Sequence, residues 1–254
     1  MRGLKGKNVV VTGGASGIGQ ATAQRFLEEG CSVCVFDCDT DALARVGKEL
    51  PDLAGAISAD VSVPDDVQRA FAEAIERMGS VDVLINNAGI SIRHDFLDIT
   101  LEEWDRVLDI NLRGVFLVAQ TAARHMVEQG SGVIVNTAST AGTTGYPHYA
   151  DYSASKGGVI GLTLAMSLEL APTVRVTAVS PGYTLTPMQR AEYTDEMLAA
   201  VNRKIPLGRH ADPAEIAALY AFLASDDAAF ASGQVYVMDG AETTGGLCSQ
   251  WTHE

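Results

Sequence analysis

Two patterns of apolar residues alternate along the chain. Short runs rich in β-branched residues are separated by longer stretches in which apolar residues recur at helical spacing. This alternation is typical of an α/β protein in which helices cover both faces of a parallel sheet. We expect strands over residues 8–12, 32–37, 55–59, 81–86, 133–137, 174–179 and 235–238. Seven such strands fit one doubly wound sheet.

The stretches between the strands predict amphipathic helices. They cover residues 17–29, 41–50, 65–78, 101–128, 152–170 and 213–224. Thr100 and Glu103 have capping-box spacing, Asp212 directly precedes the last helix, and Ser62 stands before the third. Linker-like tracts and longer repeats are absent from the sequence. Residues 1–254 are therefore expected to form one continuous domain that carries both cofactor and substrate sites.

Charge and hydropathy narrow the classes of partner. The sequence has 32 acidic and 18 basic residues, a formal net charge of −14, and the acidic residues are scattered along the chain. Such a surface repels polyanions, so neither nucleic acid nor an anionic membrane is an expected partner. The sequence shows neither a secretory signal nor an apolar run of membrane-spanning length. We expect a cytoplasmic protein.

The cysteines have two interpretations. Cys31 and Cys34 form a C-x-x-C pair, which invites a redox or zinc site. Cys31 directly precedes the predicted strand over residues 32–37 and Cys34 lies within it, however, and positions three apart on a strand point to opposite faces. We therefore interpret Cys31 and Cys34 as small buried thiols rather than a metal or disulfide site; the other two cysteines are Cys38 and Cys248.

A glycine-rich turn follows the first strand. It reads Thr-Gly-Gly-Ala-Ser-Gly-Ile-Gly over residues 12–19 and leads into a helix. Glycines let the backbone turn tightly and approach a pyrophosphate, and free amides at a helix start favour negative charge. The residues expected to contact the cofactor here are Gly13, Ser16, Gly17, Ile18 and Gly19. The alternative is a turn that serves only close packing.

The second strand ends at Asp37, where a carboxylate can accept hydrogen bonds from the adenosine ribose hydroxyls. A carboxylate would repel a 2′-phosphate. Neither Ser16 nor Cys38 supplies the basic side chain that such a phosphate needs. The expected cofactor is therefore NAD rather than NADP, although Asp37 taken alone also suits a strand-end turn.

Three further residues suggest proton chemistry. Tyr152 and Lys156 are four residues apart and share one face of the predicted helix. Ser139 precedes Tyr152 by thirteen residues and follows a strand, at the edge where parallel sheets bind ligands.

Together these motifs resemble the short-chain dehydrogenase/reductase family over practically the whole chain. The resemblance rests on T-G-x-x-x-G-x-G at 12–19, Asp60-Val61, Asn86-Asn87-Ala88-Gly89, Asn111, Ser139, Tyr152 with Lys156, and Pro181-Gly182 with Thr186. It implies a Rossmann-type fold and hydride transfer between NAD(H) and a CH–OH group.

The resemblance also implies catalytic roles. Tyr152 would be the general acid/base, Ser139 would hydrogen-bond the reacting oxygen, and Lys156 would hold the nicotinamide ribose. Asn111 would support a water-linked proton path to Lys156. The Lys156 ammonium is expected to lower the pKa of Tyr152 from its ordinary value near 10. Taken singly, each residue could also have a purely structural role: Tyr152 and Lys156 at a helix start, Ser139 in a strand-end turn and Asn111 as a packing amide.

Further cofactor contacts are carried over from the family. They are Asp60, Val61, Asn87, Gly89, Pro181, Gly182, Thr184 and Thr186. Two positions depart from the family pattern: Thr177 replaces a usual asparagine, and Thr184 replaces a usually apolar residue whose backbone meets the carboxamide.

Substrate specificity is expected from the loops over residues 91–95, 141–151 and 183–201. Their polar and aromatic candidates are His94, Thr143, Tyr146, His148, Tyr183 and Gln189, beside Ser139 and Tyr152. The predicted substrate is a small secondary alcohol or ketone, with polyols and sugars first. No metal is expected, because His94 and His148 lack a third ligand.

Two other functions stay open: a 3-oxoacyl thioester reductase and a non-catalytic dinucleotide sensor. The resemblance also implies a homo-oligomer, commonly a tetramer, built on the long helices after Thr100 and Asp151. The tail over residues 241–254, with Leu247 and Trp251, is expected to fold over a neighbouring subunit.

Overall fold

A computed structural model describes residues 1–244 of the chain. Its centre is a seven-stranded sheet in the order β3-β2-β1-β4-β5-β6-β7. The strands are β1 (Asn8–Thr12), β2 (Ser32–Asp37), β3 (Gly55–Ser58), β4 (Val83–Asn86), β5 (Gly132–Thr137), β6 (Val174–Pro181) and β7 (Val235–Met238). Every neighbouring pair is parallel. The predicted doubly wound α/β sheet is confirmed.

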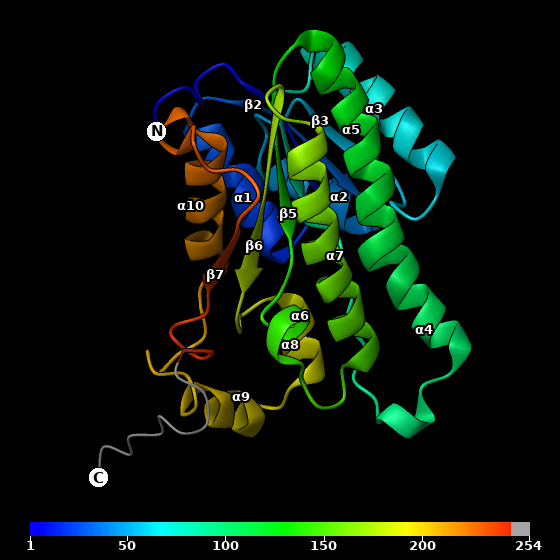
Figure 1. The fold of residues 1–254 in the computed structure, drawn as a ribbon, viewed down its shortest axis with the longest axis vertical. Helices are drawn as coiled ribbons and strands as arrows, with labels where there is room; N and C mark the ends of the chain where they lie inside the picture. Colours follow the sequence, from blue (N-terminus) through cyan, green and yellow to red (C-terminus); the bar gives the residue numbers. More distant parts are fainter. Residues whose placement is uncertain (245–254) are drawn as a thin grey trace.

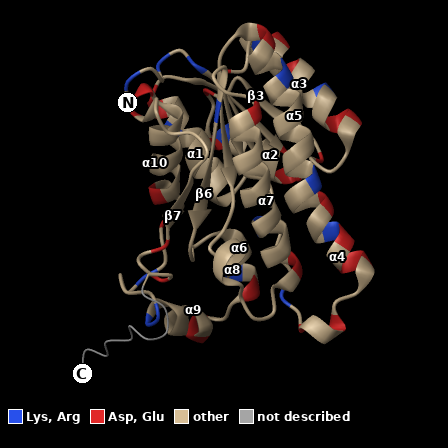
Figure 2. Ribbon diagram, in the orientation of Figure 1, with Lys and Arg blue, Asp and Glu red and all other residues tan. Residues whose placement is uncertain are grey.

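Helices cover the sheet on both faces, as Figure 1 shows for α1 and α10 against α5 and α7. One layer contains α1 (Gly17–Glu28), α2 (Thr40–Glu49) and α10 (Pro213–Ala224), and the other contains α3 (Pro64–Met78), α5 (Val115–Gln129) and α7 (Ala150–Glu169). Side chains alternate accordingly: Val9 and Val11 of β1 join the core of the first layer, and Val10 joins that of the second. The charged positions lie mainly on outer helices and loops (Figure 2).

The C-x-x-C pair is split between the two cores. Cys31 packs in the first core and Cys34 in the second, and both are buried free thiols. Burial raises the pKa of each thiol to about 11, which suits packing rather than reactivity. Cys248 lies outside the described residues.

The helix predicted over residues 101–128 consists of three segments. They are α4 (Leu101–Leu108), the π-helical segment η2 (Asp109–Gly114) and α5. The expected capping box is present before α4, with Glu103 N donating to Thr100 Oγ1 and Thr100 N to Glu103 Oε2. Asn111 lies within the π-helical segment, a widening that hydrophobic spacing alone does not reveal.

Short helices absent from the sequence-based prediction lie in the loops. They are α6 (Ala141–Thr144), α8 (Pro187–Glu192), α9 (Asp195–Asn202) and the 3₁₀ turns η1 (Phe96–Asp98) and η3 (Asp226–Ala228). In Figure 1, α6, α8 and α9 gather below the sheet, beyond the carboxyl ends of β5 and β6. These helices therefore surround the edge at which a ligand is expected.

Several predicted boundaries shift by a few residues. Strand β4 begins at Val83 rather than 81, β6 extends to Pro181, and α7 begins at Ala150. Ser62 does not cap α3, because the N-cap position is Val63; the Ser62 hydroxyl donates to Asp60 Oδ1. Within residues 1–244, no helix is long and apolar enough to cross a membrane.

Candidate active site

A cavity of about 350 Å³ lies over the carboxyl ends of the strands. The predicted cofactor residues that line it are Gly13, Ser16, Gly17, Ile18, Asp37, Asp60, Val61, Asn87, Gly89, Tyr152, Lys156, Pro181, Gly182, Thr184 and Thr186. Gly19 lies buried beneath the glycine turn and does not line the cavity. The sheet order reverses direction between β1 and β4, which is where open α/β sheets form their ligand crevice.

The glycine turn needs its glycines. Gly13 and Gly17 have φ of +62° and +52°, which side chains rarely adopt. A Cβ on Gly19 would lie 2.0 Å from the Gly13 carbonyl oxygen. The start of α1 has no side-chain cap and no acidic residue in its first turn. Its free amides can therefore receive an anionic group.

Asp37 is held by the backbone on both sides. Its Oδ2 accepts a hydrogen bond from Ala15 N (3.1 Å) and its Oδ1 from Asp39 N (3.1 Å). These bonds fix the carboxylate beside the glycine turn, where it lines the 350 Å³ cavity, called the larger cavity below, with Cys38 and Asp60.

Thr12 ties the ends of β1 and β4 together. Its Oγ1 accepts hydrogen bonds from Asn87 N and Ala88 N, both at 3.0 Å, and Asn87 Nδ2 donates back to the Thr12 carbonyl at 3.1 Å. Besides the cofactor contact expected of it, Asn87 therefore holds the two strand ends together.

Lys156 is a buried cation, 3% exposed. Its Nζ donates to the Thr137 carbonyl at the end of β5 (2.8 Å) and lies 5.7 Å from the centroid of the Tyr152 ring. Burial lowers the pKa of Lys156 to about 8.

Tyr152 lies beside Lys156 and is more exposed than it. It is half-buried, and with Ser139 it lines both the larger cavity and a smaller one beside it. Burial raises the pKa of Tyr152, the hydrogen bond with Ser139 lowers it, and the negative charge of Glu192 raises it. The expected lowering of this pKa is wrong in the net direction, because burial dominates and raises it.

Asn111 is buried behind the cavity wall. Its Oδ1 accepts from Ile90 N (2.8 Å), and its Nδ2 donates to Ile90 O (2.8 Å) and Ser155 Oγ (3.1 Å). A Cβ on Gly89 would lie 3.1 Å from Asn111 Oδ1 and 3.4 Å from Lys156 Nζ, so the three residues converge. The proton path through Asn111 stays a prediction.

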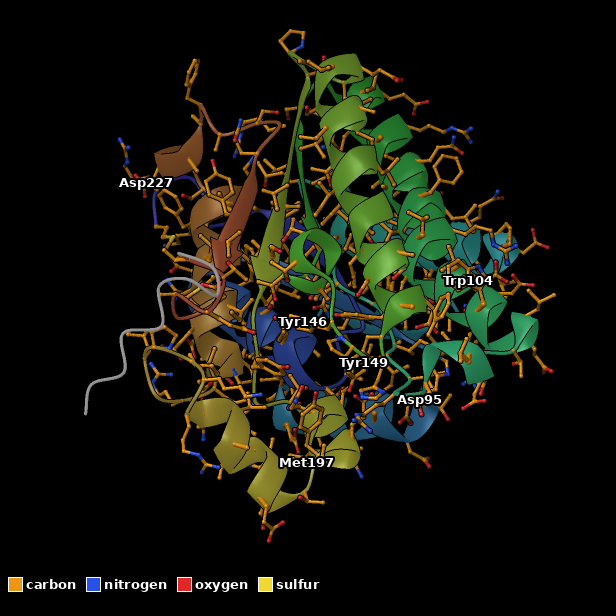
Figure 3. The ribbon with its side chains drawn as sticks, turned by 60° about the horizontal axis from the view of Figure 1, so that its bottom comes forward. Asp95, Trp104, Tyr146, Tyr149, Met197 and Asp227 are labelled. Atoms are coloured by element: carbon orange, nitrogen blue, oxygen red, sulfur yellow. The ribbon has the colours of Figure 1, made fainter. Side chains whose placement is uncertain are left out.

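The smaller cavity, about 90 Å³, is rich in tyrosine. Tyr146 and Tyr183, both predicted, line it as a stacked pair with ring centroids 5.6 Å apart. Figure 3 shows Tyr146 and Tyr149 between α7 and the α8–α9 segment. The lining residues that the sequence did not single out are Ser91, Thr140, Tyr149, Met188, Glu192 and Tyr193. Aromatic side chains within the predicted loops were the available signal.

The structure does not bring His94 and His148 to either cavity. His94 Nε2 lies 3.1 Å from Asp151 Oδ2, while Asp151 Oδ1 accepts from Tyr152 N at 2.7 Å. His148 Nδ1 lies 2.7 Å from Asp95 Oδ1. His94 thus braces the start of α7, and a substrate contact for either histidine stays a prediction. Among residues 1–244, no group of three or more His, Cys, Asp or Glu side chains is placed to hold a metal ion.

Comparisons with known proteins identify the family of the chain. A family model described as enoyl-(acyl carrier protein) reductase matches residues 13–241. A short-chain type dehydrogenase/reductase from Mycobacterium marinum superposes with a TM-score of 0.90 at 39% identity, covering 95% of this chain and 97% of that one. The chain belongs to the short-chain dehydrogenase/reductase family. It is an oxidoreductase of the type that interconverts CH–OH and C=O groups.

Members of this family with different substrates resemble the chain about equally. Glucose 1-dehydrogenase of Gluconobacter oxydans is 40% identical over 94% of this chain and 92% of its own length. A 3-ketoacyl-(acyl-carrier-protein) reductase of Brucella melitensis, solved in complex with NADH, has a TM-score of 0.90 at 35% identity and covers 94% and 99% of the two chains. Family membership therefore leaves the substrate open.

Gly19→Ala should weaken dinucleotide binding at least about tenfold, because its Cβ would displace the Gly13 carbonyl from the turn. Binding is measured by NADH fluorescence and folding by circular dichroism. Gly47→Ala, in α2, meets nothing within 4 Å and is the control. Equal NADH affinity in both variants would contradict the assignment of the turn.

Lys156 should make stability depend on pH. Below its folded pKa of about 8, the charged ammonium is destabilised by burial; between pH 8 and the ordinary value of 10.5 the folded state loses the proton first, and this destabilisation disappears. The unfolding free energy of the wild type relative to Lys156→Met should thus rise by on the order of 2–3 kcal/mol between pH 7 and pH 10.5.

Urea unfolding followed by circular dichroism at a series of pH values measures this difference. Lys5→Met, at an exposed position, is the control and should leave the pH dependence of the wild type unchanged. A pH-independent difference for Lys156→Met would show that the ammonium is not destabilised by burial.

Proposed function

We propose that the chain is an NAD-dependent dehydrogenase that transfers a hydride between NAD(H) and a small secondary alcohol or ketone, with polyols and sugars as the first candidates. The observation that carries this proposal is the position of Ser139 and Tyr152, which line both cavities. A reacting carbon at that junction would meet a cofactor on one side and these two hydroxyls on the other.

The residues divide the proton chemistry between them. When bound, the nicotinamide supplies the hydride acceptor for oxidation or the hydride for reduction. During oxidation Tyr152 takes the proton of the substrate hydroxyl, and Ser139 hydrogen-bonds the same oxygen as its charge develops. Lys156 binds the nicotinamide ribose, and Asn111 supports a water-linked path that returns the proton to solvent. Reduction reverses each transfer.

The preference for NAD rests on Asp37. Its carboxylate lines the larger cavity at the end of β2, and Lys156 is the one basic side chain among the described lining residues. Lys156 lies beside Tyr152, so a 2′-phosphate near Asp37 would meet negative charge without a basic partner. The NADH complex of the Brucella melitensis relative is consistent with this choice.

Two alternatives remain. A 3-oxoacyl thioester reductase is supported by the likeness to the Brucella melitensis reductase, although Asp37 fits oxidation with NAD better. A non-catalytic dinucleotide sensor is disfavoured, because Asn111, Ser139, Tyr152 and Lys156 are all present in one constellation.

Assembly and location are further proposals. A homotetramer is supported by exposed apolar side chains on the long helices, such as Phe116 of α5 and Leu164 and Leu168 of α7. The contribution of the tail at Leu247 and Trp251 lies outside the described residues. One domain over residues 1–254, the cytoplasmic location and the absence of nucleic-acid and membrane partners stay predictions.

NADH formation at mildly alkaline pH across polyols, sugars, cyclic alcohols and hydroxy acids tests the function. We expect at least one strong substrate, kcat/KM at least about tenfold higher with NAD⁺ than with NADP⁺, and a roughly 10²–10⁴-fold loss of kcat in Tyr152→Phe. Asp37→Ala should shrink the cofactor preference. Clear NADP⁺ preference would overturn the cofactor assignment, and tight NAD binding without turnover would favour the sensor.

A further inference from the structure

Helix α8 presents two polar side chains to the smaller cavity. Gln189 and Glu192 are three residues apart, on one face of the helix, and both line this cavity with Ser139 and Tyr152. They therefore lie on the wall that a substrate bound at Tyr152 must face.

Glu192 is already an acceptor on both oxygens. Its Oε1 accepts from Ser91 Oγ (2.5 Å) and its Oε2 from the Tyr149 hydroxyl (2.7 Å). A carboxylate has about four acceptor positions, so each oxygen can receive one more donor. Ser91 and Tyr149 direct their protons to Glu192, and the wall around it therefore presents oxygen lone pairs to the cavity.

Gln189 supplies a hydrogen-bond donor to the same wall. Its Nε2 is buried and has no hydrogen-bond partner among the described residues. An unpaired buried donor is costly, and a turn of the Gln189 amide toward a ligand oxygen in the cavity would satisfy it. A hydroxyl group can donate to Glu192 and accept from Gln189, whereas an alkyl group satisfies neither.

The negative charge of the smaller cavity disfavours substrates that carry a carboxylate. Glu192 is the one ionic side chain among the described residues that line the smaller cavity, and that lining includes no Lys, Arg or His. Glu192 and Tyr152 line the same cavity, so the negative charge of Glu192 lies close to the position of the reacting carbon. A substrate carboxylate held there would be repelled.

We propose that Glu192 determines substrate specificity by accepting a hydrogen bond from a second hydroxyl group of the substrate, with Gln189 donating to the same group. Neutral diols and polyols are then preferred to monohydric alcohols and to hydroxy acids. This inference rests on the proposed dehydrogenase function and names the substrate class for that site.

The test compares kcat/KM with NAD⁺ for substrates of one carbon skeleton: 2,3-butanediol, 2-butanol and 3-hydroxybutanoate. We expect the wild type to prefer the diol to 2-butanol by at least about tenfold. Glu192→Gln should reduce that ratio about tenfold and raise the ratio of 3-hydroxybutanoate to 2-butanol by a similar factor. Ratios are used because any change at Tyr152 affects all three substrates.

Two further variants isolate the cause. Glu192→Asp keeps the charge but withdraws it by one methylene, so it should weaken the diol preference without admitting the hydroxy acid. Glu196→Gln removes an exposed carboxylate of α9 that lines neither cavity, and it should leave every ratio unchanged. Circular dichroism confirms that each variant is folded.

The outcomes separate the two proposals. Turnover of these alcohols with the same ratios in the wild type and Glu192→Gln overturns the role of Glu192 and leaves the dehydrogenase function standing. A preference of about tenfold for 3-amino-2-butanol over the diol also overturns it, because Glu192 would then select a cation. Absence of NADH formation with every alcohol tested overturns the proposed function itself.

Discussion

Strands β1 and β4 pair in parallel at the point where the order of the sheet reverses. The segments that follow these two strands diverge after their carboxyl ends. The Thr12 hydroxyl holds the two ends together by accepting hydrogen bonds from the amides of Asn87 and Ala88. The approach is so close that a Cβ on Gly13 would lie 2.9 Å from the Ala88 Cα. The glycine turn and the segment after β4 therefore pack against each other and together form one wall of the cavity. The other residues of the site line the same cavity.

Helix α7 completes the site at the cost of a buried charge. Lys156 reaches the Thr137 carbonyl at the end of β5, which places Tyr152, one helical turn earlier, beside Ser139. The ammonium has no acidic partner among the described residues, and its lowered pKa records the unfavourable environment. Such local destabilisation is common where a site is arranged for chemistry rather than stability.

The sequence predicted the parts of the site that depend on local spacing. Strand and helix periods were enough to place the glycine turn, Asp37 at a strand end and the Tyr152–Lys156 pair. The structure brings all of them to one cavity, as predicted. Glu192 and Tyr149 could not be assigned that way, because their hydrogen bond joins the loop before α7 to α8. The pKa of Tyr152 depends on how deeply its side chain is buried, and the spacing of residues along the sequence does not indicate this. His94 shows the same limit, since its contact with Asp151 is set by how a loop folds back onto α7.

We expect the hydride to pass directly between the substrate carbon and the bound nicotinamide beside Tyr152. Oxidation of 2,3-butanediol deuterated at its carbinol carbons, followed by mass spectrometry of the NADH formed, tests it most directly. The expected result is one deuterium in each NADH, little label in water, and a strongly reduced yield with Tyr152→Phe. Label released to solvent, or unchanged transfer in Tyr152→Phe, would contradict it.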